Sequence, residues 1–208
     1  MVTYERPALP EEEYRDATGT VIDYGRRWEI QKGPPQHTYS VVTHPQRFSP
    51  VVVVADALIE HLATSYDVTV TTHGQRTSLD PGPHKANLQF DIHRGQEPQV
   101  EVHAGMWSIE SFPFCSCDAC DEDIIDLVTD LEQYVFTVVK GGLREAATFR
   151  HINISLEGSL IGDTATISQS TTRKIEHPDR RRVRRERQQV PAQWLPWTPH
   201  AEPRGKQE

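Results

Sequence analysis

The spacing of apolar residues changes its period along this chain, and that change limits the folds that the chain can adopt. Residues 49–66 and 121–142 repeat apolar side chains at the spacing of an amphipathic helix, whereas 67–72, 86–93 and 99–104 alternate apolar and polar residues. Alternation of this kind predicts strands with one buried face and one wet face, as in antiparallel sheets. The pattern therefore predicts three strands between two helices.

Two more strands are predicted after the second helix, at 148–157 and 159–168, with Gly158 between them. Residues 73–85 are polar and contain glycine and proline, which favours a loop. The predicted order is helix, three strands, helix, two strands. The simplest fold with this order is α+β, with an antiparallel sheet of about five strands and two main amphipathic helices on one face.

The ends of both predicted helices carry sequence signals. Ser49 is a good N-cap for the first helix, and Pro50 fits its first turn, where a missing N–H costs nothing. We expect Asp118 or Asp121 to cap the second helix and Gly141 to end it.

The length of 208 residues suits one domain with tails. Residues 1–20 are charged and contain two prolines, which predicts a flexible acidic arm. Residues 21–170 then form a single α+β domain, and 171–208 form an arginine- and proline-rich C-terminal tail. Trp194 and Trp197 in that tail either dock it onto the core or form an exposed motif that binds a partner.

Charge is unevenly distributed along the chain. The net charge is −8, yet the run DRRRVRRER at 179–187 holds six arginines and only two acids. Because phosphate contacts need a basic face, the acidic body argues against nucleic-acid binding as the main activity. The arginine run could contact RNA, DNA or an acidic partner, or it could lie on the protein's own acidic surface near Glu122, Asp126 or Asp130. We favour this intramolecular role or a purely solvated one.

No stretch approaches the roughly 18–20 apolar residues that cross a membrane, and the longest apolar run is VVVVA at 51–55. The first 16 residues lack a basic region followed by an apolar core, which excludes a secretory signal at this end. Three clustered cysteines fit a reducing compartment better than a disulfide scaffold. We therefore predict a cytoplasmic protein without membrane contact.

All three cysteines lie within six residues, in the stretch FPFCSCDACDED at 112–123. Cys115, Cys117 and Cys120 have the spacing C-x-C-x-x-C, and their thiolates could converge on one ion if the chain turns tightly. Zinc would need a fourth ligand. His103 is the nearest upstream candidate, at the end of a predicted strand. The alternative fourth ligands are carboxylates of the same stretch: Asp118, Asp121 and Glu122.

Two other interpretations of this stretch remain open. Cys117 and Cys120 form a C-x-x-C pair near a predicted helix N-terminus, which lowers a thiol pKa, although the surrounding acids disfavour a thiolate. Alternatively, the stretch is a packed junction between strand and helix, with Phe112, Phe114 and some of the cysteines facing inward.

Several blocks of the chain resemble an uncharacterised actinobacterial family, a domain of unknown function whose motif reads CGCDACDE. The resemblance spans roughly residues 22–145, and Ser116 stands where that motif has glycine, which restricts the turn. It implies a compact soluble domain and no known activity. The blocks are CSCDACDE before an amphipathic helix, VHAG at 102–105, YGRRW at 24–28, YSVVTHPQRFSP at 39–50, VADALIEHL at 54–62 and WLPW at 194–197.

No complete catalytic motif occurs, since the chain lacks G-x-x-x-x-G-K-[ST], G-x-G-x-x-G, H-E-x-x-H and G-x-S-x-G. The first hypothesis is therefore a non-enzymatic binding protein with a protein partner. The second is a small zinc-binding protein that uses the cysteine cluster, and the third is a thiol redox enzyme. His73, His84 and His93 could also bind a metal with His103 on the polar face of the sheet, although scattered histidines are usually surface residues.

Overall fold

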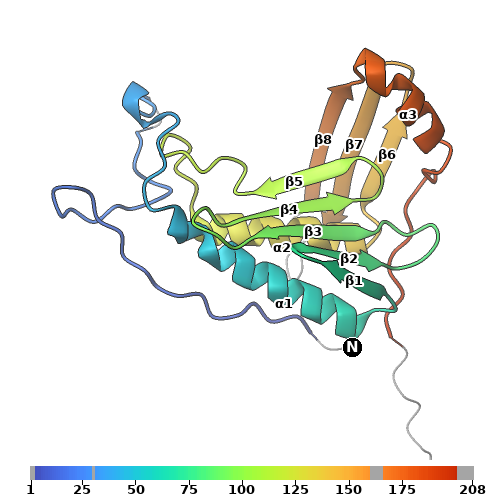
Figure 1. Cartoon of the computed structure of the whole chain (residues 1–208), viewed down its shortest axis with the longest axis horizontal. Helices are drawn as coiled ribbons and strands as arrows, with labels where there is room; N and C mark the ends of the chain where they lie inside the picture. The colour runs from blue at the N-terminus through green and yellow to red at the C-terminus, as the bar shows by residue number, and fades with distance from the viewer. Residues whose placement is uncertain (1–2, 30, 160–165, 201–208) are drawn as a thin grey trace, which may run out of the picture.

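The computed structural model describes residues 3–29, 31–159 and 166–200, and these form an α+β fold with two antiparallel sheets (Figure 1). The first sheet has the order β1-β2-β3-β4-β5 and the second the order β6-β7-β8. The predicted fold class is confirmed. The strands are β1 (Thr69–His73), β2 (Arg76–Asp80), β3 (Leu88–His93), β4 (Gln99–Ala104), β5 (Ser108–Phe112), β6 (Leu143–Ala147), β7 (His151–Ser159) and β8 (Thr166–Lys174).

Two long helices, α1 (Ser49–Ser65) and α2 (Ile124–Val139), pack against each other and against the first sheet. The inward residues of β3 alternate as predicted, so that Leu88, Phe90 and Ile92 are buried. Each such side chain stabilises the fold by about 1.5–3 kcal/mol. Because α2 also contacts β7, it joins the two sheets.

The predicted loop at 73–85 is wrong. β1 runs to His73, turns at Gly74 and Gln75, and returns as β2, with Leu79 fully buried. Gly74 has φ +61°, a conformation that glycine adopts without strain. β2 was missed because it buries one large apolar residue and therefore shows no alternation.

β5 was also missed, because its only isoleucine, Ile109, points outward and is 44% exposed, while Ser108 is buried. β5 completes the five-stranded sheet by pairing with β4, so that Val100 lies opposite Phe112. The two late strands that the sequence suggested for this sheet belong to the second sheet instead.

The second sheet differs in detail from its prediction. β6 follows α2 directly and was not predicted, and β7 begins at His151 rather than at residue 148. The last predicted strand, 159–168, lies largely in 160–165, outside the described residues, and β8 continues to Lys174.

The N-cap of α2 is Asp123, not Asp118 or Asp121. Its carboxylate accepts hydrogen bonds from the amides of Ile125, at 2.7 Å, and Asp126, at 3.1 Å. α1 begins at Ser49 as expected, directly after a 3-10 turn at Pro45–Phe48. The stretch Pro45–Ser65 is apolar and long enough for a membrane span by length and composition alone, but α1 packs in the core of this α+β domain.

Trp194 and Trp197 are buried in the main core. Of the two interpretations of these tryptophans, docking onto the core is therefore the one that the structure shows. Trp197 Nε1 donates to the Ala86 carbonyl at 2.8 Å, and Trp194 Nε1 donates to Glu145 Oε2 at 3.0 Å. The buried Glu145 carboxylate also accepts three consecutive backbone amides of residues 106–108. Through Glu145, Trp194 of the tail is thereby linked to the turn between β4 and β5.

The arginine run lies far from the acids of α2. It forms α3 (Arg180–Glu186), which follows a 3-10 turn at His177–Asp179 and sits at the far end of the second sheet (Figure 1). Val183 packs with Trp107 in a second small core. Among the ion pairs of the described residues, Arg182 binds the neighbouring Asp179 and Glu186, and none joins this run to α2.

The N-terminal arm passes along α1 toward the loop before it (Figure 1). Near its start, the Tyr4 hydroxyl donates to Glu132 Oε1 of α2 at 2.8 Å, and Arg6 pairs with the same carboxylate. These contacts hold Tyr4 and Arg6 against α2. A further 3-10 turn, Gln36–Thr38, precedes α1.

Candidate metal-binding site at the cysteine turn

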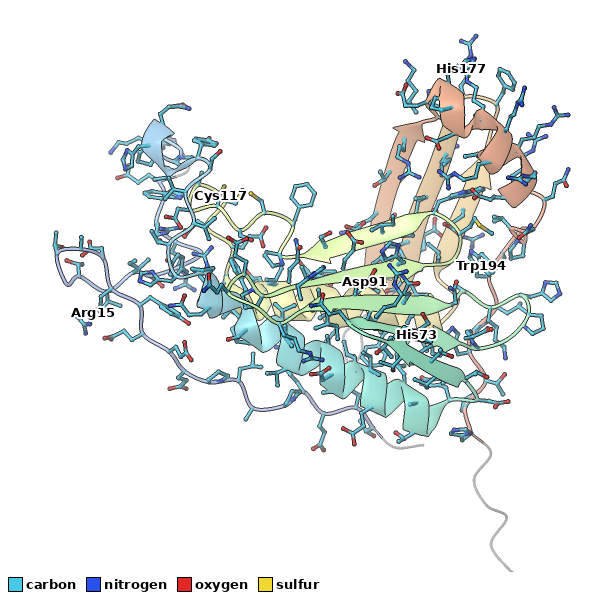
Figure 2. All side chains as sticks on the ribbon, viewed as in Figure 1. Arg15, His73, Asp91, Cys117, His177 and Trp194 are labelled. Carbon is cyan, nitrogen blue, oxygen red and sulfur yellow. The ribbon has the colours of Figure 1, made fainter. Side chains whose placement is uncertain are left out.

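The three cysteines lie in an irregular loop, residues 113–123, between β5 and α2. Figure 2 marks Cys117 in this loop. A backbone hydrogen bond from the Cys120 amide to the Cys117 carbonyl, at 3.1 Å, closes a turn. The Sγ atoms of Cys115 and Cys117 are 3.3 Å apart, and those of Cys117 and Cys120 are 3.5 Å apart. All three cysteines are free thiols. The chain therefore turns tightly enough to bring the thiols together.

These separations are close to those of a thiolate metal site. Zinc takes thiolate sulfurs at 2.3 Å, so two sulfurs on a tetrahedral ion lie about 3.8 Å apart. All three Sγ atoms lie within 4.8 Å of one another. Small side-chain rotations thus suffice to place three thiolates around one ion.

The turn is held from one side by Asp118, a residue that is only 5% exposed. Its carboxylate accepts hydrogen bonds from the Thr43 amide, at 3.1 Å, and from the Thr43 hydroxyl, at 2.9 Å. Its backbone amide donates to the Val41 carbonyl at 2.8 Å, and the Ala119 amide donates to the Thr38 carbonyl. The segment before α1 therefore fixes the middle of the C-x-x-C.

Arg27 holds the turn from the other side. Its Nη2 donates to the Asp118 carbonyl at 2.6 Å, and its Nε donates to the buried Asp121 carboxylate. The guanidinium stacks on the rings of Tyr24 and Trp28, with centroids at 4.4 and 4.9 Å. Trp28 Nε1 donates to the same Asp118 carbonyl at 3.1 Å. A partly buried, stacked and ion-paired arginine of this kind is a rigid support.

The acids beside the cysteines were expected to oppose a thiolate, but Asp118 and Asp121 point to Thr43 and Arg27 instead. Burial on its own raises the pKa of Cys117. Hydrogen bonds from the Cys115 thiol and from backbone amides outweigh that effect, and the pKa of Cys117 falls to about 7. At this cysteine the hydrogen bonds outweigh the effect of burial, and a thiolate is accessible near neutral pH.

The pKa of Cys120 moves in the opposite direction. Burial, together with hydrogen bonds that involve the two neighbouring sulfurs, raises it to about 12. Cys120 is nevertheless the exposed member of the three. Phe112 is buried as predicted, whereas Phe114 was expected to face inward and is 83% exposed. The loop is thus pinned by its backbone and acids rather than by inward packing of its second phenylalanine.

His103 does not join the cysteines. It lies on β4, where its Nε2 is 2.6 Å from Glu101 Oε1, on the polar face as predicted. The pairing of β4 with β5 places His103 opposite Ile109, whereas the cysteine loop leaves β5 at the other end, after Phe112. The histidine and the cysteines are therefore at opposite ends of this strand pair.

Among the alternative fourth ligands, Glu122 retains an uncommitted oxygen. Its Oε1 accepts a hydrogen bond from the Cys115 amide at 3.3 Å, while its Oε2 is buried and has no hydrogen-bond partner among the described residues. Burial raises the pKa of Glu122, opposed by the Cys115 amide and by the positive charge of Arg47. Of the three carboxylates suggested by the sequence, Glu122 is the one that could turn toward an ion.

Arg47 is a second buried cation behind this loop, with an exposure of 4%. Its guanidinium lies 3.7 Å from the Tyr24 ring centroid and 4.3 Å from that of Phe48, and its nitrogens have no hydrogen-bond partner among the described residues. Because its charge acts on Glu122, it offsets negative charge beside the cysteines. Arg27, Thr43 and Arg47 lie 66 or more residues before the loop, so no local sequence pattern indicated that they contact it.

An acidic cleft with a volume of about 510 Å³ adjoins the cysteine loop, and Phe114 and Tyr134 are part of its wall. Burial raises the pKa of three of its acids, Glu110, Glu122 and Asp130. A cleft of this character suits a positively charged ligand. Its acidic residues are Glu110, Asp121, Glu122, Asp123, Asp126 and Asp130.

A family model described as a family of unknown function (DUF6226) matches residues 10–201. The chain belongs to the DUF6226 family. Membership confirms the resemblance to a domain of unknown function, while the actinobacterial origin and the CGCDACDE motif stay predictions. The DUF6226 match includes both the cysteine loop and the segment around Arg27 that clamps it. No curated protein and no solved structure matches the chain.

Proposed function

We propose that this DUF6226 chain is a non-enzymatic binding protein whose cysteine turn holds one zinc ion. The observation that carries the proposal is the convergence of three free thiols, Cys115, Cys117 and Cys120, within 4.8 Å of one another. Thiolates are the ligands that zinc prefers in structural sites. We expect this protein to work in the cytoplasm, where its cysteines stay reduced.

Two further features support a metal at this position. The pKa of about 7 at Cys117 means that one ligand ionises readily at neutral pH, as metal binding requires. Glu122 offers a buried, uncommitted oxygen beside Cys115 and would complete a four-ligand site. A closed site of this kind stabilises structure, so we assign the ion a structural role.

We propose that the neighbouring acidic cleft carries the binding function. A zinc ion in the turn would hold one wall of this cleft, because Asp121 and Glu122 belong to both. The exposed Phe114 offers an apolar contact at the rim. We therefore propose that the partner is a protein that presents a basic segment with an apolar residue.

Cobalt titration tests the metal proposal, because Co²⁺ replaces zinc and thiolate ligation gives it strong charge-transfer absorption. The untagged, reduced protein is expected to develop this absorption with one equivalent of Co²⁺ and to lose it when zinc is added. Cys117→Ser should abolish the signal, and Glu122→Gln should weaken binding. Ser116→Ala is the matched control, because it changes the same turn without removing a sulfur. If the wild type develops no charge-transfer absorption when Co²⁺ is added, the proposal is contradicted.

A second candidate function is thiol–disulfide exchange, which the opposite pKa shifts of Cys117 and Cys120 favour. The Cys117 thiolate would attack a disulfide of a partner and release one partner thiolate. Cys120 would then lose its proton and attack the Cys117 sulfur, which forms an intramolecular disulfide and leaves the partner reduced. Cys120→Ser should trap the mixed disulfide with a small disulfide reagent. Failure to trap it at any ratio of reagent would exclude this candidate.

A further inference from the structure

A second group of chemically capable side chains lies on the first sheet, on the face turned away from the helices. Leu88, Phe90 and Ile92 of β3 point into the core, so Asp91 points to the opposite face. Asp91 is paired directly with Glu101 of β4, and His103 follows two residues later on the same face. Figure 2 marks Asp91 on this sheet, well apart from Cys117.

The three side chains converge on a small volume. His103 Nε2 lies 2.6 Å from Glu101 Oε1 and 3.4 Å from Asp91 Oδ2. One ligand atom from each residue lies within 4.8 Å of the others. The side chains are 32%, 40% and 15% exposed for His103, Glu101 and Asp91, so an ion in solution can reach them.

We propose that Asp91, Glu101 and His103 bind a second divalent cation, of the class that accepts mixed imidazole and carboxylate ligands, such as zinc. One imidazole nitrogen and two carboxylates provide three protein ligands and leave the remaining coordination positions open. The site shares no residue with the cysteine turn. It therefore stands independently of the proposed function.

The surroundings orient the ligands and leave room for a further ligand. Arg76 donates to both oxygens of Asp91, at 2.7 and 2.9 Å, which fixes the carboxylate. Hydrogen bonds of this kind to a ligating carboxylate are common in metal sites. A hollow of about 580 Å³ lies beside the group and is also lined by His73 and His93. The open positions of the ion would face this hollow.

Asp91, Glu101 and His103 lie on two central strands of the sheet, unlike charged side chains on a mobile surface loop. Both strands are paired on both sides, β3 with β2 and β4, and β4 with β3 and β5. The backbone positions of Asp91, Glu101 and His103 are therefore fixed before any ion arrives. The simplest alternative is a surface ion network without a metal, in which Arg76 pairs with Asp91 and His103 contacts both acids.

Zinc titration of the untagged, reduced full-length protein by calorimetry separates the two possibilities. The wild type is expected to bind two equivalents, one tight and one weaker. His103→Ala should remove the weaker equivalent and keep the tight one, and Asp91→Asn should reduce the affinity of the weaker site at least tenfold. His177→Ala is the matched control, since His177 is exposed at the far end of the second sheet, and it should change nothing.

Circular dichroism of each variant checks that the sheet is intact. A stoichiometry that is the same in the wild type, His103→Ala and Asp91→Asn would overturn this inference and establish a surface ion network only. If the proposed function holds, the double variant Cys117→Ser/Cys120→Ser loses the tight zinc equivalent of the cysteine turn. If the double cysteine variant loses one zinc equivalent and His103→Ala loses none, the cysteine site is supported and the site at Asp91, Glu101 and His103 is rejected.

Discussion

Replacing Asp118 by alanine should release the cysteine turn from the segment that precedes α1. The Asp118 carboxylate is buried and accepts two hydrogen bonds from Thr43, one from the amide at 3.1 Å and one from the hydroxyl at 2.9 Å. Alanine leaves both donors without that acceptor. It also removes a carboxylate oxygen that lies 3.9 Å from the guanidinium of Arg27.

The expected loss of unfolding free energy follows from these contacts. A hydrogen bond to a charged acceptor contributes about 1.5–3 kcal/mol, so two of them contribute about 3–6 kcal/mol before relaxation. Water can enter the vacated space and satisfy the Thr43 donors in part, and Arg27 keeps its ion pair with Asp121. We therefore expect a loss of about 3 kcal/mol, or a Tm lower by about 6–12 °C for a chain of this size.

Urea unfolding followed by tryptophan fluorescence measures this loss, and zinc titration of the same variant measures the effect on the metal. Because Asp118 holds the turn without contacting an ion, its removal should weaken zinc affinity by about tenfold. Asp126→Ala is the control: this acid is exposed in the first turn of α2, and its loss should cost less than about 1 kcal/mol. Equal, small losses in both variants would refute the role assigned to Asp118.

Three further predictions concern other parts of the chain. In metal-free protein, iodoacetamide should modify Cys117 faster than the other two cysteines, and the rate should rise through pH 7 because the pKa of Cys117 is about 7. Mass spectrometry of quenched samples measures this rate. Burial raises the pKa of Glu110, so ionisation of this carboxyl opposes folding. Glu110→Gln should therefore raise the unfolding free energy at pH 7 relative to the wild type. Urea titrations at pH 7 and pH 4 check this, because the gain should vanish at pH 4, where the carboxyl is protonated in both states. Trp194→Phe removes the hydrogen bond to the buried Glu145 carboxylate and should lower the unfolding free energy by about 1.5–3 kcal/mol by the same method.

Local patterns predicted the elements that bury a regular apolar stripe. α1, α2, β3 and β4 were recognised because their inward residues repeat with the period of a helix or a strand. β2 and β5 were not recognised, because each takes most of its stability from pairing with neighbours rather than from its own side chains. Strand pairing depends on contacts across the sheet, which a single stretch of sequence does not encode.

In the candidate site, too, the local features were predicted from the sequence, whereas the long-range contacts were not. The spacing of Cys115, Cys117 and Cys120 predicted that the thiols could converge, and they do. The contacts of Arg27 and Thr43 with the cysteine loop join residues that are 75 to 94 positions apart in the sequence. The only local signal was the high density of charged and aromatic residues in YGRRW. His103 was a reasonable fourth ligand by distance along the chain, but the pairing of β4 with β5 carries it to the opposite end of the sheet.

Zinc content of the untagged protein, purified without chelator, tests the central claim most directly when wild type and Cys117→Ser/Cys120→Ser are compared by elemental analysis. The account predicts that the wild type holds about one more zinc per chain than the variant, and that the variant has a lower Tm. Equal zinc content in the two proteins, or no zinc in either, would contradict a metal site at the cysteine turn.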